Sequence, residues 1–133
     1  MWFCEQERVR QILQTRGNVL VIEKFNIPVR TNDLQTLKPG AWLNDEVINF
    51  YFGMIMERAE DERYPSCYAH QTIFFTTLEN RGYSAVRRWT RRVDIFAKDL
   101  VLIPVHLSVH WTIVIVDMKK KSVEFFDSMG AKR

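Results

Sequence analysis

Residues 100–127 read LVLIPVHLSVHWTIVIVDMKKKSVEFFD, and they indicate the fold of the 133-residue chain more clearly than any other segment. Apolar and β-branched residues dominate Leu100–Val105 and Trp111–Asp117, and a third β-rich run follows at Ser122–Asp127. Three consecutive lysines separate the last two runs and predict a polar hairpin turn. Because the first two runs are apolar almost throughout, we expect their sheet to be covered on both faces.

Helical patterns precede this sheet. Glu5–Arg16 places its apolar residues on one helical face, and Val19–Phe25 suits a short strand. Thr31–Leu37 predicts a short helical turn. Asn44 predicts the N-cap of the main helix, which two acidic residues follow in the first turn. The apolar stripe expected along that helix consists of Val47, Ile48, Tyr51, Phe52 and Ile55.

Two segments between the main helix and the sheet are less regular. Thr72–Leu78 fits either a helix or a strand, and Tyr83–Arg92 predicts a short basic helix with Arg88, Arg91 and Arg92 on one face. Helices followed by antiparallel strands indicate an α+β class. Repeats and linkers are not apparent, so residues 1–133 are expected to form part of a single domain.

Composition narrows the function classes. The chain is 47% hydrophobic and 26% charged, which is typical of a globular core, and its net charge of +3 does not by itself indicate a nucleic-acid partner. Cys4 and Cys67 are too few for a disulfide framework, which favours a reducing compartment, the nucleus or the cytoplasm. No membrane span is expected, because Pro104, His106 and His110 interrupt the longest apolar run.

His110 and Asp127 are predicted to lie close together if the last two β-rich runs form a hairpin. If Asp117 pairs with Ser122 across the lysine turn, counting back along both strands places Thr112 opposite Asp127. Neighbours on adjacent strands lie about 5 to 8 Å apart, so the two side chains are within reach of each other. An aspartate that orients an imidazole is half of a Cys-His-Asp or Ser-His-Asp triad. The alternative is that His110 begins one strand and Asp127 ends another without contact.

Four blocks add sequence context: WLNDEVINFY (42–51), RWT (88–90), PVHLSVHW (104–111) and FDSMG (126–130). In this order and spacing they closely resemble the Ulp/sentrin-specific protease family, cysteine proteases that process SUMO and remove it from conjugated proteins. The resemblance implies a papain-like α+β fold whose catalytic residues occur in the order His, Asp, Cys. It implies no cofactor and no metal.

The resemblance also implies roles for individual residues. His110 would be the general base and Asp127 its orienting carboxylate. Trp42 and Trp111 match two tryptophans that enclose the modifier's Gly-Gly tail, where only residues without Cβ fit; plain core packing is the alternative for each. The positions matched to contacts with the folded modifier are Asp45 and Arg88, with His106 and His70 on the same face. A helix-start charge is the alternative for Asp45, and a solvated surface is the alternative for the arginine cluster.

The nucleophile is where this sequence departs from the family. The family's glutamine and catalytic cysteine lie well beyond the FDSMG block, whereas this sequence stops six residues past Asp127. Neither Cys4 nor Cys67 stands where the family has its thiol. We therefore expect the N-terminal part of a protease domain, an incomplete papain-like fold, without activity on its own.

Other functions stay open. A catalytically inactive module that binds a ubiquitin-like modifier fits the same residues, and the modifier could be a relative of SUMO such as NEDD8. A nucleic-acid binder would use the arginine cluster with Trp89 as a stacking platform, but further basic and aromatic positions are not evident. A metal hydrolase on His106 and His110 is excluded if both lie on one strand, where their separation is about 13 Å.

Overall fold

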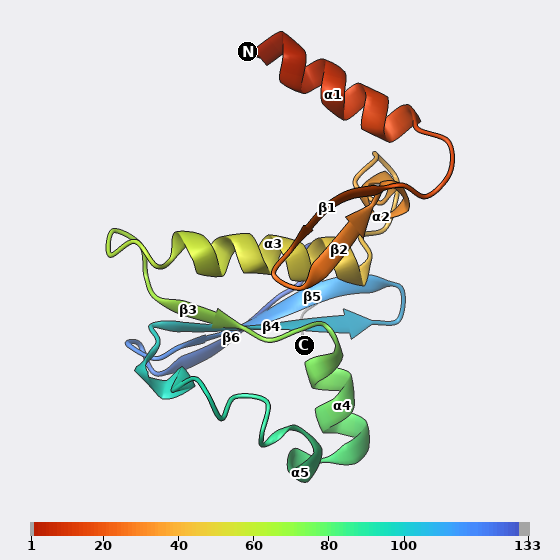
Figure 1. Ribbon diagram of the computed structural model, residues 1–133. Coiled ribbons are helices and arrows are strands. Elements are labelled where there is room, and N and C mark those ends of the chain that lie inside the picture. Colours follow the sequence, from red (N-terminus) through yellow and green to blue (C-terminus); the bar gives the residue numbers. More distant parts are fainter. Residues whose placement is uncertain (1, 131–133) are drawn as a thin grey trace. The chain divides into compact units, whose positions relative to one another are not determined.

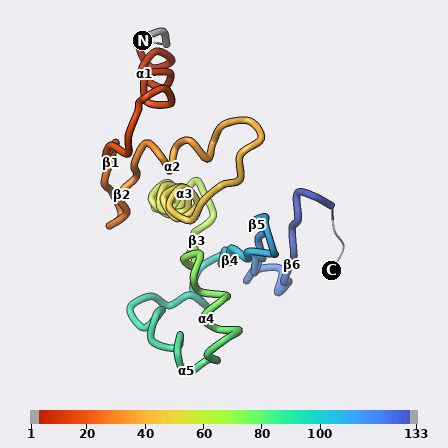
Figure 2. Tube along the Cα trace, turned by 90° about the vertical axis from the view of Figure 1, so that its right-hand side faces the viewer, coloured from red at the N-terminus to blue at the C-terminus, as the bar shows by residue number. Residues whose placement is uncertain are grey.

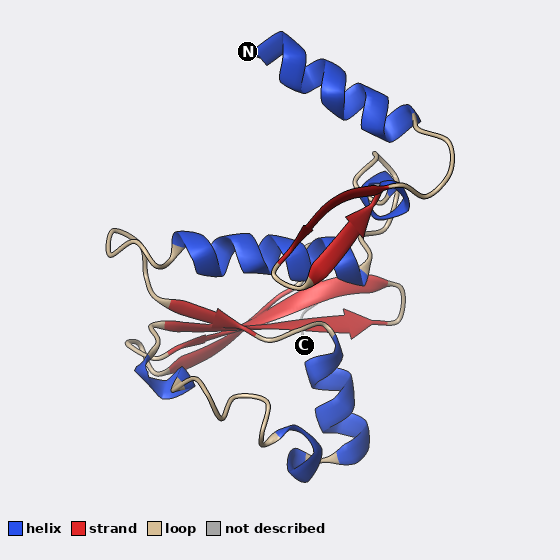
Figure 3. Ribbon diagram, in the orientation of Figure 1, coloured by secondary structure: helices blue, strands red, loops and turns tan. Residues whose placement is uncertain are grey.

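The computed structural model describes residues 2–130, with side chains from Cys4 onward. Helices alternate with two small sheets, which confirms the α+β class (Figures 1 and 3). The elements are α1 (Trp2–Gln14), β1 (Leu20–Lys24), β2 (Ile27–Arg30), α2 (Thr31–Gln35), α3 (Asp45–Arg58), β3 (Cys67–Ala69), α4 (Ile73–Arg81), α5 (Tyr83–Val86), the 3₁₀ turn η1 (Ile95–Ala97), β4 (Leu100–Leu107), β5 (His110–Asp117) and β6 (Ser122–Phe126). They group into two compact units, Met1–Tyr51 and Phe52–Arg133.

The first unit is organised around a two-stranded hairpin. β1 and β2 pair antiparallel, with Lys24 opposite Ile27 across a two-residue turn in which Phe25 and Asn26 both have φ of 58°. A left-handed Phe is unfavourable; here the Phe25 ring packs edge-on against Phe50 at 5.4 Å between centroids. Beneath the hairpin, the buried Thr31 hydroxyl accepts from the Val19 N–H and donates to a backbone carbonyl.

Helix α3 begins where the sequence predicts. The Asn44 side-chain oxygen accepts a hydrogen bond from the Val47 N–H at 3.1 Å, and its amide donates to Asp33 at 2.9 Å. Asn44 therefore caps α3 and ties it to α2. The predicted apolar stripe is wrong at Tyr51, which is 59% exposed.

The second unit contains a four-stranded sheet in the order β3-β4-β5-β6. The three predicted strands pair antiparallel as expected, and a fourth strand that was not predicted, β3, pairs parallel to β4, with Cys67 opposite Leu100. Three residues are too short for a periodicity signal, and the sequence reading therefore missed this strand. The other pairs are antiparallel, and Asp117 lies opposite Ser122 as predicted.

The core of this unit lies along β4. Val101, Leu102, Pro104 and Val105 are buried, and because neighbouring residues point to opposite faces, both faces of β4 are covered as expected. The edge strand β6 differs, with Val123 and Phe126 exposed. In Figures 1 and 2, α4 and the end of α3 that follows Tyr51 lie on opposite sides of β3 and β4.

The segment between α4 and β4 is less helical than predicted. Thr72–Leu78 is largely helix, as part of α4, which resolves that ambiguity. The expected helix Tyr83–Arg92 ends at Val86, and residues 87–92 form successive turns instead. The arginines therefore do not share a helical face. Within residues 2–130, no helix is long and apolar enough to cross a membrane.

Candidate active site

The turn between β4 and β5 sets the position of His110. Leu107 pairs with His110 across Ser108 and Val109, and Ser108 has φ of 56°. His110 is thus the first residue of β5, held by a pairing that extends without a break to Leu100 opposite Asp117. A register fixed over eight pairs gives the imidazole a defined starting point.

Asp127 arrives at the same end of the sheet from β6. The β5–β6 register ends with Ile113 opposite Phe126, which places Asp127 beside Thr112. Nε2 of His110 lies 3.0 Å from Oδ1 of Asp127. The predicted contact is therefore confirmed, and the alternative of two unconnected strand ends is wrong.

The Asp127 carboxylate is enclosed, whereas the imidazole reaches the surface. The Asp127 side chain is 1% exposed and that of His110 is 16% exposed. Because a carboxylate can only accept, Nε2 of His110 donates this hydrogen bond. Proton exchange with a nucleophile would then take place at Nδ1.

The sequence reading missed one group that holds the carboxylate. The Met129 N–H donates to Oδ1 of Asp127 at 2.9 Å, and the Gly130 N–H donates to the Asp127 carbonyl at 2.9 Å. Gly130 has φ of 77°, a value that glycine adopts readily. The Asp-Ser-Met-Gly sequence is a turn signal that could have revealed this support.

Trp111 lies beside His110 but on the other face of the strand. Its ring stacks on that of His106, with centroids 4.5 Å apart and an interplanar angle of 29°. His106 is exposed and Trp111 is half-buried. His106 and His110 do not share one strand as predicted, because the β4–β5 turn separates them, so the strand separation of about 13 Å does not apply to this pair. In residues 4–130, no three His, Cys, Asp or Glu side chains gather as a metal site.

The other predicted binding residues differ in exposure. Trp42 is 56% exposed, so core packing does not explain it, and Asp45 and Arg88 are also exposed. His70 is only 5% exposed and stacks on Phe74 at 3.6 Å between centroids. Burial lowers the pKa of His70 from 6.5 to about 4. The expectation that His70 lines a binding surface is therefore wrong, because the ring belongs to the core.

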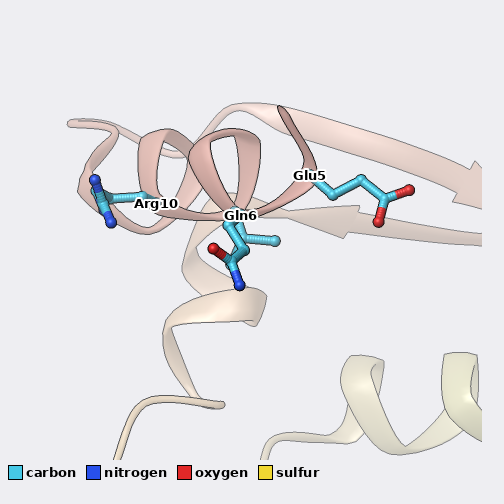
Figure 4. A pocket seen from close by; sticks show the side chains of 4 residues that line it. Glu5, Gln6 and Arg10 are labelled. Atoms are coloured by element: carbon cyan, nitrogen blue, oxygen red, sulfur yellow. The ribbon is translucent and has the colours of Figure 1, made fainter. Parts of the chain in front are cut away.

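Neither cysteine has the surroundings of a reactive thiol. Cys67 is buried on β3, and this burial raises the pKa of its thiol, with weaker opposing effects from Lys98 and Arg58. A thiol with a raised pKa is a poor nucleophile at neutral pH. Cys4 is exposed on α1, near a shallow surface hollow lined by Glu5, Gln6, Val9 and Arg10. In that hollow, Glu5 and Arg10 point in opposite directions and do not converge on a ligand (Figure 4).

The pairing of an imidazole with a carboxylate, seen here between His110 and Asp127, also occurs in hydrolases that use histidine to activate a nucleophile. Residues 41–133 match the model of the Ulp1 protease family, C-terminal catalytic domain. The chain belongs to this family.

Similar proteins and solved structures belong to the same family. The chain is 46% identical over 108 residues to mouse sentrin-specific protease 2, covering 81% of this chain and 18% of that protein. A sentrin-specific protease of Caenorhabditis elegans is 47% identical over 113 residues, covering 84% of this chain and 16% of the relative. The yeast Ulp1 protease domain in complex with Smt3, the yeast ortholog of SUMO, matches with a TM-score of 0.84 and 33% identity, covering 98% of this chain and 58% of that one. The chain thus spans less than a fifth of the length of the two sentrin-specific proteases.

Proposed function

We propose that the chain contributes the histidine and aspartate of a cysteine protease that hydrolyses the peptide or isopeptide bond at the C-terminus of a SUMO-type modifier. The observation that carries this proposal is the 3.0 Å contact between His110 and Asp127. It is supported by family membership and by the relative solved in complex with Smt3. SUMO-conjugated proteins would be the substrates.

In the proposed mechanism, Nδ1 of His110 takes the proton of a cysteine thiol, and the thiolate attacks the carbonyl carbon of the modifier's last residue. The resulting imidazolium is held by Asp127. It then gives its proton to the leaving amine as the carbon–nitrogen bond breaks. Water hydrolyses the thioester in the second half of the reaction and restores the thiol.

The binding roles rest on the resemblance together with exposure. We assign Trp42 and Trp111 to the modifier's glycine tail and assign Asp45, Arg88 and His106 to its folded part. The exposed indole of Trp42 and the His106–Trp111 stack support these assignments. We also assign the protein to the nucleus or cytoplasm, because both cysteines are free.

The thiol in this proposal is neither of the two in residues 1–133. A solved structure of the SUMO protease Ulp1 has a catalytic cysteine, which is oxidised to a sulfenic acid in that relative. We therefore expect the 133-residue chain to leave a fluorogenic SUMO C-terminal substrate intact. Turnover that disappears on Cys67→Ser would mean that the buried thiol is the nucleophile and that the proposal is wrong.

A chimera tests the positive half of the proposal. Residues 1–133 replace the matching part of the yeast Ulp1 domain, so that the rest of that domain supplies its catalytic cysteine. We expect turnover of the SUMO substrate and its loss on His110→Ala, with Lys120→Ala, in the exposed turn at the opposite end of β5, as the control. A chimera that unfolds cooperatively yet shows no turnover would contradict the proposal.

A binding module without catalysis is the second candidate, favoured by the unsuitable surroundings of Cys67. It predicts that the chain binds the modifier and that the chimera, although folded, stays inactive. Competition between SUMO and NEDD8 for the same chain identifies the preferred modifier.

A further inference from the structure

Positive charge is concentrated in six consecutive residues, of which only Arg88 has a role in the proposed function. Residues 87–92 read RRWTRR, here called the arginine segment. Its four arginines exceed the net charge of +3 of the whole chain, because the other 127 residues hold 15 basic and 16 acidic side chains. All four arginines are exposed.

The arginine segment has an ordered backbone. The Trp89 N–H donates to the Val86 carbonyl at 2.9 Å, and the Val93 N–H donates to the Thr90 carbonyl at 3.1 Å. Val86 is 5% exposed, and the Trp89 ring contacts Phe74 edge-on at 6.1 Å between centroids. The segment is thus anchored to its unit beyond α5, where the chain leaves that helix in Figure 1.

Nothing in the described part of the chain neutralises this charge. Among residues 4–130, no ion pair joins Arg87, Arg88, Arg91 or Arg92 to an acidic side chain. The nearest acid in sequence, Asp94, accepts a hydrogen bond from the Phe96 N–H at 3.1 Å. Four adjacent like charges repel one another, and an anionic partner relieves that repulsion.

Aromatic residues accompany the charge. Tyr83 precedes the segment and is 73% exposed, Phe96 follows it and is 78% exposed, and Trp89 within it is 39% exposed. The segment therefore combines guanidinium groups, which bind carboxylates bidentately, with apolar rings.

We propose that the arginine segment is a docking site for an acidic polypeptide segment that also carries apolar side chains. Four charges match a short run of carboxylates, whereas a nucleic acid is a longer polyanion, and the other 127 residues carry no net positive charge to extend the contact. The turns of residues 87–92 also provide neither a helix for a groove nor a sheet face for stacked bases.

This docking site is separate from the proposed chemistry and needs neither His110 nor Asp127. Arg88 was assigned above to the modifier, so the test leaves it unchanged. The test variant is Arg91→Gln with Arg92→Gln. Its matched control is Lys120→Gln with Lys121→Gln, which removes the same charge from another exposed pair.

The probe is a fluorescein-labelled dodecapeptide in which pairs of glutamates alternate with leucine, and the reference peptide has glutamine in place of glutamate. Fluorescence polarisation at about 0.1 M salt should show binding of the acidic peptide alone. The Arg91/Arg92 variant should bind about 10-fold more weakly or worse, and the lysine control should bind as the unchanged chain does. Circular dichroism confirms that both variants remain folded.

Three results would overturn the proposal. The first is that the acidic peptide does not bind. The second is that the arginine and lysine variants weaken peptide binding equally, which means non-specific charge attraction. The third is that a single-stranded oligonucleotide binds more tightly than the peptide and depends on the same arginines. The last result would make the surface a nucleic-acid site.

Discussion

Two histidines of the second unit, His70 and His110, have different surroundings, and these surroundings suit one to a structural role and the other to a chemical role. His70 follows β3 and lies 5% exposed between the rings of Tyr68 and Phe74. His110 begins β5, reaches the surface and has a carboxylate at 3.0 Å. The first environment opposes a charge on the ring, and the second provides a carboxylate as a hydrogen-bond partner. The residue type alone therefore does not show whether a histidine is structural or chemical; the side chains that contact it do.

The largest expected effect is a loss of catalytic activity when Asp127, the partner of His110, is substituted. In the active chimera, Asp127→Asn should lower kcat/KM by roughly 10²–10⁴-fold, because the amide can present its N–H to Nε2 and favour the wrong tautomer. The Michaelis constant should change little. Asp99→Asn is the matched control, since Asp99 ties Ser66 to the start of β4 far along the sheet from His110. Equal losses in both variants would mean that Asp127 is structural.

The pH dependence of the free energy of unfolding tests whether His70 is buried as a neutral ring. The pKa of His70 is about 4 in the folded chain and 6.5 without burial, so the unfolded state binds the proton first as the pH falls. Stability from this group is complete above about pH 6.5 and is lost progressively toward pH 4. Between pH 7.5 and pH 5 the loss is about 2 kcal/mol.

His70→Phe should remove that loss, as measured by urea unfolding at both pH values. The ring of phenylalanine retains the stacking on Phe74, so the comparison isolates the titration. His106→Gln is the control, because it replaces an exposed histidine outside the ring cluster of His70. An unaltered dependence in His70→Phe would show that His70 is not the group responsible.

A smaller effect is expected beneath His110. The buried Thr112 hydroxyl donates to the Val105 carbonyl at 2.8 Å, two residues along β5 from the imidazole. Thr112→Val should lower the free energy of unfolding by about 1 kcal/mol. Thr77→Val removes an exposed hydroxyl that also donates to a backbone carbonyl and should cost much less. Similar losses at both positions would remove the distinction between buried and exposed hydroxyls.

The sequence predicted the parts of the site that depend on local pattern. The lysine turn and two apolar runs were enough to set the β5–β6 register, and hence the contact between His110 and Asp127. Asn44 was predictable as a cap for the same reason, since an N-cap depends on its own side chain and the next three residues.

Features that depend on tertiary packing were not predictable. Three residues of β3 become a strand only because Leu100–Leu102 lie beside them. The four arginines of residues 87–92 favour a helix, yet α5 ends at Val86 and the chain turns to pack Trp89 on Phe74. His70 looked like a surface residue because the rings that bury it come from β3 and α4, and sequence spacing does not place them around it.

The most direct test is the tautomer of His110, read from its ring ¹⁵N shifts at alkaline pH, where the imidazole is neutral. Because the Asp127 carboxylate can only accept, the proton should reside on Nε2, and Asp127→Ala should shift the population away from that tautomer. His70 should be unaffected by that substitution. A neutral His110 that carries its proton on Nδ1 in the unchanged chain would contradict the claim that Asp127 orients it as a general base.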